Sequence, residues 1–245
     1  MRLVLAAMAF VVGFGCSAGA GEKPLTELLA ACDQVAANPF DNTRPAGVPG
    51  VRFTKIAPET AISACEEAAT AAPDDARIAM QLGRAYMAAK NIDAARSQFF
   101  KAYQHGSAQA AAYLAFLYQN GQGVPRDYVE AVRLSRIAAD QGNAEGQNSL
   151  GVLLERGRGG PKNETEAARL FKLSADQGYP PAQNNLGVLY RAGLAGLPKD
   201  DREAVRLFKL AADQGSPPAQ ANLGLAYLGG LGGLLNDDRE AVRWF

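Results

Sequence analysis

Apolar residues recur along most of this chain at the three- and four-residue spacing of one helix face, and the helices they predict come in pairs. Within the first helix of each pair, a Leu-Gly dipeptide returns at Leu150, Leu186 and Leu223. The intervals are 36 and 37 residues (186 − 150 and 223 − 186). Self-similarity at a period of this size predicts a solenoid, in which each helix pair buries its apolar face against the next.

The first helix of each unit carries the pattern Ala-Gln-x-x-Leu-Gly-x-x-Tyr, as in residues 182–190. Leu186 and Tyr190 are four residues apart and share one face, with Gly187 between them. A glycine inside a helix costs about 1 kcal/mol relative to alanine. Its recurrence therefore indicates that the partner helix approaches closely at this position.

The second helix follows a glycine-rich turn and begins with an acid or amide three residues before a glutamate. This arrangement predicts a capping box, in which the first side chain accepts from free amides and the glutamate bonds back to the cap. It occurs four times: Asp127/Glu130, Asn163/Glu166, Asp200/Glu203 and Asp237/Glu240. Complete second helices end on Asp-Gln-Gly, which places Gly142, Gly178 and Gly215 for left-handed C-caps.

The N-terminal third of the chain lacks this period. Residues 22–35 and a segment beginning at Pro58 have the spacing of amphipathic helices. Residues 38–55 between them contain three prolines and two glycines, which predicts a loop. We assign residues 21–72 to an N-terminal helical cap and residues 73–107 to a helix pair with a shorter turn.

The repeated pattern resembles the Sel-1-like repeat, a longer-turn relative of the tetratricopeptide repeat, which the pair at residues 73–107 resembles. The repeat units are residues 108–143, 144–179, 180–216 and 217–245. The resemblance implies an all-α fold, namely a right-handed α-solenoid of antiparallel helix pairs with an N-terminal helical cap. We interpret the last unit as a truncated repeat, because it stops within its second helix. The alternative is an end that exposes Trp244 and Phe245 to a partner.

The first twenty residues predict a secretory signal peptide. Arg2 supplies the positive start, an apolar run extends to Phe14, and Ala18-Gly19-Ala20 forms a small-residue cleavage site. Two alternatives are a short anchor helix and a lipoprotein signal that ends at Cys16. No other stretch approaches the roughly 20 apolar residues needed to span a bilayer. We therefore expect an exported bacterial protein, placed in the periplasm, with secretion or lipid anchoring at Cys16 as alternatives.

Two cysteines remain once residues 1–20 are removed. Cys32 and Cys65 lie on the apolar faces of two neighbouring predicted helices. In an oxidising compartment an even pair of this kind predicts a disulfide, here across the proline-rich loop. The alternative is two buried free thiols.

Charge and composition limit the chemistry that this chain performs. Its formal net charge is +0, so the sequence lacks the basic excess that draws nucleic acid or anionic membranes. His105 is the single histidine, and it stands at the end of a predicted helix, where a cation-capable residue is an ordinary choice. We predict no catalytic residues, no metal site and no cofactor, because the chain offers almost no nitrogen or sulfur ligands.

In tetratricopeptide-like stacks the first helices line a concave groove, at positions two and five residues on either side of the repeated leucine. Carried over to this chain, these positions predict a groove lined by Arg77, Met80, Arg84, Met87, Gln109, Ala112, Phe116, Gln119, Glu145, Asn148, Val152, Glu155, Pro181, Asn184, Val188 and Arg191. This mix of side chains suits a peptide or protein segment, with the asparagine amides clamping its backbone. The alternative is an ordinary solvated face.

The resemblance implies a non-enzymatic interaction module or scaffold of the cell envelope that binds a protein or peptide, as in signalling or envelope assembly. The alternative function is that of the cysteine-rich secreted relatives, which bind cell wall or bind and hydrolyse β-lactams. Those relatives carry a cysteine pair in each repeat, whereas residues 108–245 contain none. The sequence identifies neither the partner nor the oligomeric state.

Overall fold

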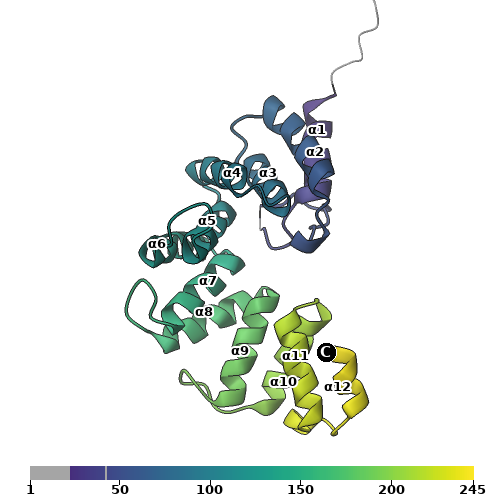
Figure 1. Cartoon of the computed structure of the whole chain (residues 1–245), viewed down its shortest axis with the longest axis vertical. Coiled ribbons are helices and arrows are strands. Elements are labelled where there is room, and N and C mark those ends of the chain that lie inside the picture. The colour runs from purple at the N-terminus through teal and green to yellow at the C-terminus, as the bar shows by residue number, and fades with distance from the viewer. Residues whose placement is uncertain (1–22, 42) are drawn as a thin grey trace, which may run out of the picture.

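The structure, a computed structural model, describes residues 23–41 and 43–245, and every regular element within these residues is a helix. Pairs of helices stack into an open arc, with α1 and α2 at one end and α11 and α12 at the other (Figure 1). The predicted all-α solenoid is confirmed, whereas the predicted signal peptide and Cys16 lie outside the described residues. The helices are α1 (Leu25–Ala36), η1 (Phe53–Lys55, a 3-10 turn), α2 (Pro58–Ala71), α3 (Ala76–Ala88), α4 (Ile92–Gln104), α5 (Ala108–Asn120), α6 (Tyr128–Asp140), α7 (Ala144–Glu155), α8 (Glu164–Asp176), α9 (Pro180–Ala192), α10 (Asp201–Asp213), α11 (Pro217–Leu228), η2 (Leu231–Gly233, a 3-10 turn) and α12 (Asp238–Trp244).

The repeated glycine sets the distance between the helices of a pair. A Cβ atom added at Gly187 in α9 would lie 2.7 Å from the ring of Phe208 in α10, and one at Gly151 in α7 would lie 2.7 Å from Phe171 in α8. Gly83 meets Phe99 in the same way, at 2.5 Å. Because no real Cβ sits this close to a ring, the phenylalanine can pack flat against the helix backbone only where the side chain is absent.

The predicted caps of the second helices are present, but only half of the predicted capping box is correct. Asp200 accepts from the backbone N–H groups of Arg202 and Glu203, both at 3.0 Å. The N–H of Asp200 donates to the carbonyl of Tyr190 at 2.9 Å, so Glu203 has no cap donor to bind. Instead the Glu203 carboxylate accepts from Arg206, one turn further on. The same exchange occurs in the other three second helices, as the pairs Glu130/Arg133, Glu166/Arg169 and Glu240/Arg243.

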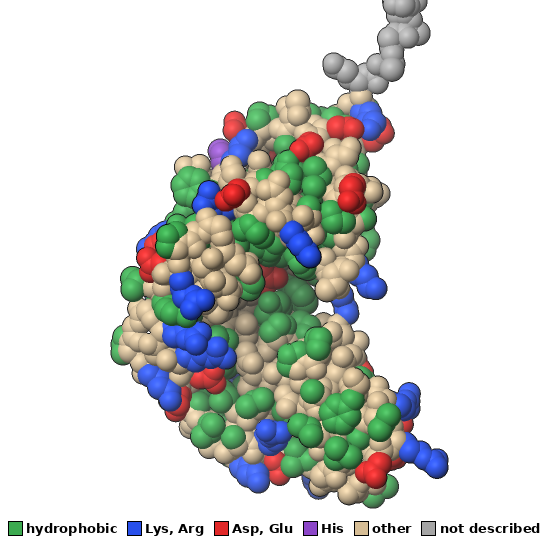
Figure 2. All heavy atoms as spheres, in the orientation of Figure 1, with side chains coloured by type: hydrophobic (Ala, Val, Ile, Leu, Met, Phe, Trp, Pro, Cys, Tyr) green, Lys and Arg blue, Asp and Glu red, His purple; other side chains and the backbone are tan. Residues whose placement is uncertain are grey.

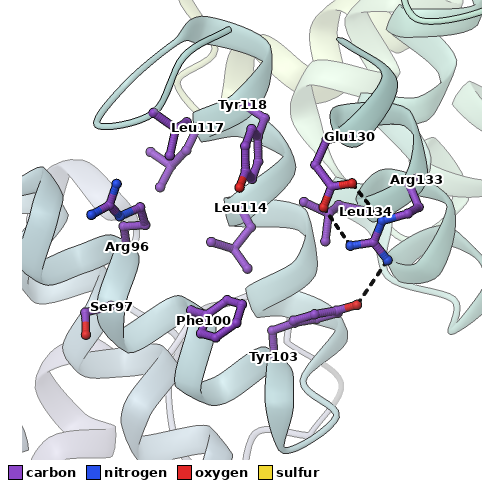
Figure 3. Close-up of a pocket in the computed structure, with 11 residues that line it drawn as sticks. Arg96, Ser97, Phe100, Tyr103, Leu114, Leu117, Tyr118, Glu130, Arg133 and Leu134 are labelled. Atoms are coloured by element: carbon purple, nitrogen blue, oxygen red, sulfur yellow. Dashed lines mark hydrogen bonds and ion pairs between the residues drawn. The ribbon is translucent and has the colours of Figure 1, made fainter. Parts of the chain in front are cut away.

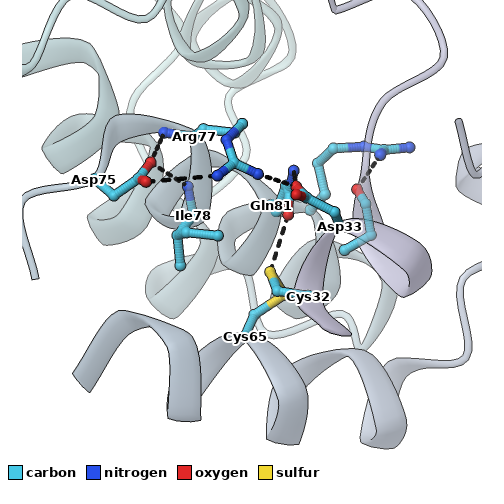
Figure 4. The surroundings of a disulfide bond; sticks show 9 residues. Cys32, Asp33, Cys65, Asp75, Arg77, Ile78 and Gln81 are labelled. Atoms are coloured by element: carbon cyan, nitrogen blue, oxygen red, sulfur yellow. Dashed lines mark hydrogen bonds and ion pairs between the residues drawn. A yellow bond between two sulfur atoms is a disulfide. The ribbon is translucent and has the colours of Figure 1, made fainter. Parts of the chain in front are cut away.

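The N-terminal cap is closed internally by one covalent bond and is joined to the next helix pair by one buried acid (Figure 4). Cys32 of α1 and Cys65 of α2 form the predicted disulfide, with their Cα atoms 4.6 Å apart. The adjacent Asp33 is buried and accepts from the side-chain amide of Gln81 at 2.7 Å and from Arg77. This acid joins α1 to α3, and the expectation that Arg77 is free to meet a partner is therefore corrected.

At the other end of the arc, the side chains of Trp244 and Phe245 behave differently. Phe245 is 68% exposed, as expected, although a Cβ at Gly224 would still meet its ring at 2.9 Å. Trp244 is partly buried against the cluster that contains Phe208 and Leu223. The expectation of two exposed aromatic side chains is therefore wrong for Trp244, because α12 turns this side chain towards α10 and α11.

Candidate functional site

The connection between α1 and α2 crosses the inner side of the arc. We call it the strap, residues 38–41 and 43–55. Its two ends are held together because the N–H of Val51 donates to the carbonyl of Ala37 at 2.7 Å. The buried guanidinium of Arg84 donates to the carbonyls of Ala36 and Val51 and to the hydroxyl of Tyr113. The segment that the sequence predicts as a loop is thus an ordered part of the concave face.

The strap reaches repeats that are far away in the sequence. The side-chain amide of Asn38 donates to Glu145 of α7 at 3.2 Å, across 107 residues. The ring of Phe40 packs edge-on against Tyr179, at the start of α9, with centroids 5.1 Å apart. Arg52 donates to the backbone carbonyl of Gln214, just after α10 and 162 residues away. The strap therefore connects the cap to the second and third repeat units, residues 144–179 and 180–216, across the opening of the arc.

A pocket of about 570 Å³ remains between the strap and the N-terminal ends of α9 and α11. Figure 2 shows the molecule hollowed here, with hydrophobic side chains inside the hollow. Rings and prolines dominate its walls, namely Phe40, Phe53, Tyr113, Tyr179, Pro180, Pro181, Pro217 and Pro218. Neither helix has a side-chain cap, and none is needed for the first two positions because proline has no N–H. The helix ends thus present an apolar wall.

The charged groups of this pocket fall into two kinds. Glu145 and Arg84 are engaged, because Glu145 accepts from Asn38 and from the side-chain amide of Gln109. Burial raises the pKa of Glu145, and it also raises the pKa of the neighbouring Tyr179 hydroxyl. Arg52 and Lys55 lie on the strap side, and the side-chain ammonium of Lys55 has no hydrogen bond or ion pair within the described residues.

Several predicted groove residues are buried inside the protein. Met80 lies in the core between α3, α4 and α5, and Ala112 is packed between neighbouring repeats. Arg84, Gln109 and Asn184 are buried as well, so the expectation that they are exposed is corrected. The physical reason is that adjacent first helices pack closely and that the strap covers the groove at α3, α5 and α7. Arg84 and Asn184 still line the pocket beside the strap, whereas Gln109 lies outside it.

The asparagines of the first helices bind one another. Asn185 donates to the side-chain oxygen of Asn148 at 3.0 Å, and Asn222 donates to that of Asn184 at 2.8 Å. We expected these amides to clamp a ligand backbone. Their carbonyl oxygens instead join α7 to α9 and α9 to α11, which stabilises the stack.

The remaining predicted residues stay accessible to different degrees. Phe116 is 43% exposed, and the others are half-buried on the first helices: Met87, Gln119, Val152, Glu155, Val188 and Arg191. Their role in binding remains a prediction. The sequence reasoning missed the strap side chains Phe40, Arg52 and Phe53, whose only signal is two aromatic residues within a loop rich in proline.

A second hollow of about 370 Å³ lies between α4, α5 and α6 (Figure 3). Phe100, Tyr103 and Leu114 line it, and Arg133 donates to the Tyr103 hydroxyl at 3.2 Å and to Glu130. Both arginines that line this hollow are paired, Arg133 with Glu130 and Arg96 with Asp93, so the hollow offers fewer unpaired charges than the strap pocket. We therefore take the strap pocket as the candidate site.

Comparison with known families agrees with the repeat architecture. The Sel1 repeat model matches residues 108–143, 144–179, 180–216 and 217–245, which is 138 of 245 residues (245 − 107). The chain belongs to the Sel1 repeat family. A tetratricopeptide repeat model also matches residues 57–113, which contain α2, α3 and α4.

Solved structures of bacterial Sel1 repeat proteins share this fold. A Sel1 repeat protein from Oxalobacter formigenes is 29% identical, with a TM-score of 0.63, over 76% of this chain and 75% of that one. A protective antigen of uropathogenic Escherichia coli is 26% identical, with a TM-score of 0.58, over 81% of this chain but only 41% of the antigen. A protein from Klebsiella pneumoniae is 26% identical, with a TM-score of 0.53, over 71% of this chain and 86% of that one.

The comparison with curated protein sequences gave no match. Among residues 23–41 and 43–245, no helix combines the length and the apolar character needed to cross a bilayer. The same residues contain no cluster of three or more histidine, cysteine, aspartate or glutamate side chains placed to hold a metal ion. Sel1 and tetratricopeptide repeats typically serve as scaffolds that bind proteins, and this chain has such a scaffold.

Proposed function

We propose that this Sel1 repeat protein is an exported, non-enzymatic interaction module of the bacterial cell envelope, which binds an extended segment of a partner protein on its concave face. The observation that carries the proposal is the strap. The concave face already accommodates one largely irregular segment of its own chain, a series of turns held through an amide, an aromatic ring and a guanidinium. The strap leaves a pocket beside it that is lined by the same kinds of groups.

Export is supported by the cysteine pair and by the N-terminal pattern. A disulfide such as Cys32–Cys65 persists in oxidising compartments and is rare where thiols are kept reduced. The pattern of residues 1–20 fits a signal peptide, and the similar solved proteins are bacterial. We place the mature protein in the periplasm, and fractionation combined with thiol labelling tests this. Cytoplasmic recovery, or reactive thiols at both cysteines in native protein, would contradict it.

Site-specific photocrosslinking tests the interaction itself. A photoreactive phenylalanine analogue at position 53 replaces a side chain that lines the strap pocket and is 40% exposed. The matched control is Leu173 of α8, which is 39% exposed and lies outside the pocket. We expect one envelope protein to crosslink at position 53 and not at position 173. Identical products at both positions, or none at position 53, would refute the concave face as the binding surface.

A β-lactam-binding function is the second candidate, and it is less well supported. The single cysteine pair lies in the N-terminal cap, so none of the four Sel1 repeats carries the pair typical of the cysteine-rich relatives. His105, the single histidine, is exposed, with its ring nitrogen 3.9 Å from the carboxylate of Asp74. Incubation with a fluorescent penicillin tests this function, and covalent labelling of the native protein would overturn our order of preference.

A further inference from the structure

We propose that the strap pocket selects peptide segments in which an apolar side chain lies next to an aspartate or glutamate. This inference rests on the proposed function and specifies the chemistry of its partner. It follows from the shape of the pocket walls and from the charges that the fold leaves without a partner.

The walls account for the apolar side chain. Four prolines at the starts of α9 and α11 face the strap, and Tyr179 and Phe53 contribute rings from opposite sides of the pocket. A cavity of about 570 Å³ is large enough for one or two bulky side chains and the backbone between them. Since the prolines remove backbone donors from the helix ends, this wall binds by apolar contact rather than by cradling an anion.

The free charges account for the acidic group. Four charged residues line the pocket, and two of them, Arg84 and Glu145, are occupied by hydrogen bonds inside the protein. The other two are basic and flank Phe53 on η1, namely Arg52 and Lys55. Arg52 uses one terminal nitrogen for the Gln214 carbonyl, which leaves donors that point elsewhere. A carboxylate beside the buried apolar side chain would complement these cations, whereas a basic peptide would be repelled.

Three capped hexapeptides test the inference, each N-acetylated and C-amidated so that side chains are the only charges. The first contains Glu-Leu-Phe-Glu between glycines, the second replaces both glutamates by glutamine, and the third replaces them by lysine. Binding is measured by isothermal titration calorimetry of the unlabelled peptides against the full chain. We expect the acidic peptide to bind roughly five- to tenfold more tightly than the glutamine peptide at low salt, since each rim contact contributes a fraction of a kcal/mol to about 1 kcal/mol.

Charge reversal identifies the site. Lys55→Glu removes a pocket cation that makes no hydrogen bond within the described residues, so the fold tolerates it. Lys209→Glu on the exposed side of α10 makes the same charge change outside the pocket and serves as the control. We expect the preference for the acidic peptide to disappear in Lys55→Glu and to persist in Lys209→Glu.

The outcomes separate this inference from the proposed function. Equal affinity for the acidic and glutamine peptides, equal effects of the two lysine variants, or no binding of any peptide at millimolar concentration would overturn the ligand chemistry. If the Phe53 crosslink still captures one partner, the interaction module stands and only its ligand class is wrong. If position 53 captures nothing either, both proposals fall.

Discussion

At the residue scale, the spacing of the solenoid depends on a position without a side chain. The glycine that follows the repeated leucine lies against a phenylalanine ring in the pairs α3/α4, α7/α8 and α9/α10. In α5/α6 the corresponding positions hold Ala115 and Ser135, both buried. The phenylalanine ring is therefore present where the first helix has a glycine and absent where it has an alanine. This is expected if the ring fills the volume that a side chain at the glycine position would occupy.

Substitution of one such glycine tests this packing. In Gly187→Ala the new methyl would lie 2.7 Å from the ring of Phe208. Overpacking typically costs 1–3 kcal/mol, and the better helix propensity of alanine offsets part of it, so we expect a net loss of about 1–2 kcal/mol. Urea unfolding measures it, with Gly160→Ala as the control because a Cβ there meets nothing within 4 Å. A variant at position 187 as stable as the wild type would disprove the packing argument.

The buried carboxylate of Glu145 predicts that the free energy of unfolding depends on pH. Burial raises its pKa above the usual 4.5, so the folded protein holds this proton more tightly than the unfolded chain does. Its contribution to stability is complete below about pH 4.5 and is lost as the pH rises through the folded-state pKa. Relative to Glu145→Gln, we expect the free energy of unfolding of the wild type to fall with rising pH above that value.

Glu166 provides the opposite control for the same measurement. The hydrogen bond from Arg169 lowers the pKa of Glu166, so its contribution is present above about pH 4.5 and is lost as the pH falls through the folded-state pKa. Relative to Glu166→Gln, the wild type should therefore gain stability as the pH rises. Parallel pH profiles for both variants, measured by urea unfolding, would contradict the assignment of Glu145 as a buried carboxylate.

At the element scale, each complete second helix of the Sel1 repeats begins at a side-chain N-cap and is followed by a glycine in the left-handed conformation. Asp127 accepts from two backbone amides at the start of α6, and Gly142 adopts a left-handed φ of 76° just after its end. The glutamate–arginine pairs lie one turn inside the helix and are exposed, so they add little individually. The caps rather than these ion pairs define where the helices begin.

Removal of one cap should therefore cost more than removal of an acid elsewhere on the same helix. We expect Asp127→Ala to lose about 1 kcal/mol of stability, because two amides lose their acceptor. Asp140→Ala, at the last residue of α6, should change stability by less than about 0.5 kcal/mol. Equal losses in chemical denaturation would show that the acid acts through its charge and not as a cap.

At the scale of the whole molecule, the strap bridges the opening of the arc. The disulfide Cys32–Cys65 encloses the strap at its base, and Arg84 clamps both of its ends. Contact with the far repeats then depends on Asn38, Phe40 and Arg52. The strap sets both the width of the opening and the shape of the pocket, which a solenoid without it would lack.

Arg52→Ala should open the arc. The variant removes the hydrogen bond to the Gln214 carbonyl, so the strap loses its attachment beyond α10. Spin labels on Thr54→Cys and Asp213→Cys report this opening as a longer and broader distance distribution. Arg96→Ala removes a comparable bond, from Arg96 to the Gly123 carbonyl, and should leave that distance unchanged. An unchanged distance in Arg52→Ala would show that Phe40 and Asn38 suffice to hold the strap.

The sequence by itself determined the helix pairs, their caps and turns, and the disulfide partners. The helices, caps and turns depend on residues within one repeat, and the disulfide partners are the two cysteines left once residues 1–20 are set aside. Only the tertiary structure decided that Arg84 and Asn184 are buried, that asparagines pair between repeats, and that a proline-rich loop forms one wall of the pocket. The place of the loop requires contacts such as Asn38–Glu145 and Arg52–Gln214, across 107 and 162 residues, which leave no periodic trace in the sequence because nothing repeats them. The asparagines do recur with the repeat, but their spacing alone does not distinguish pairing with one another from binding a ligand.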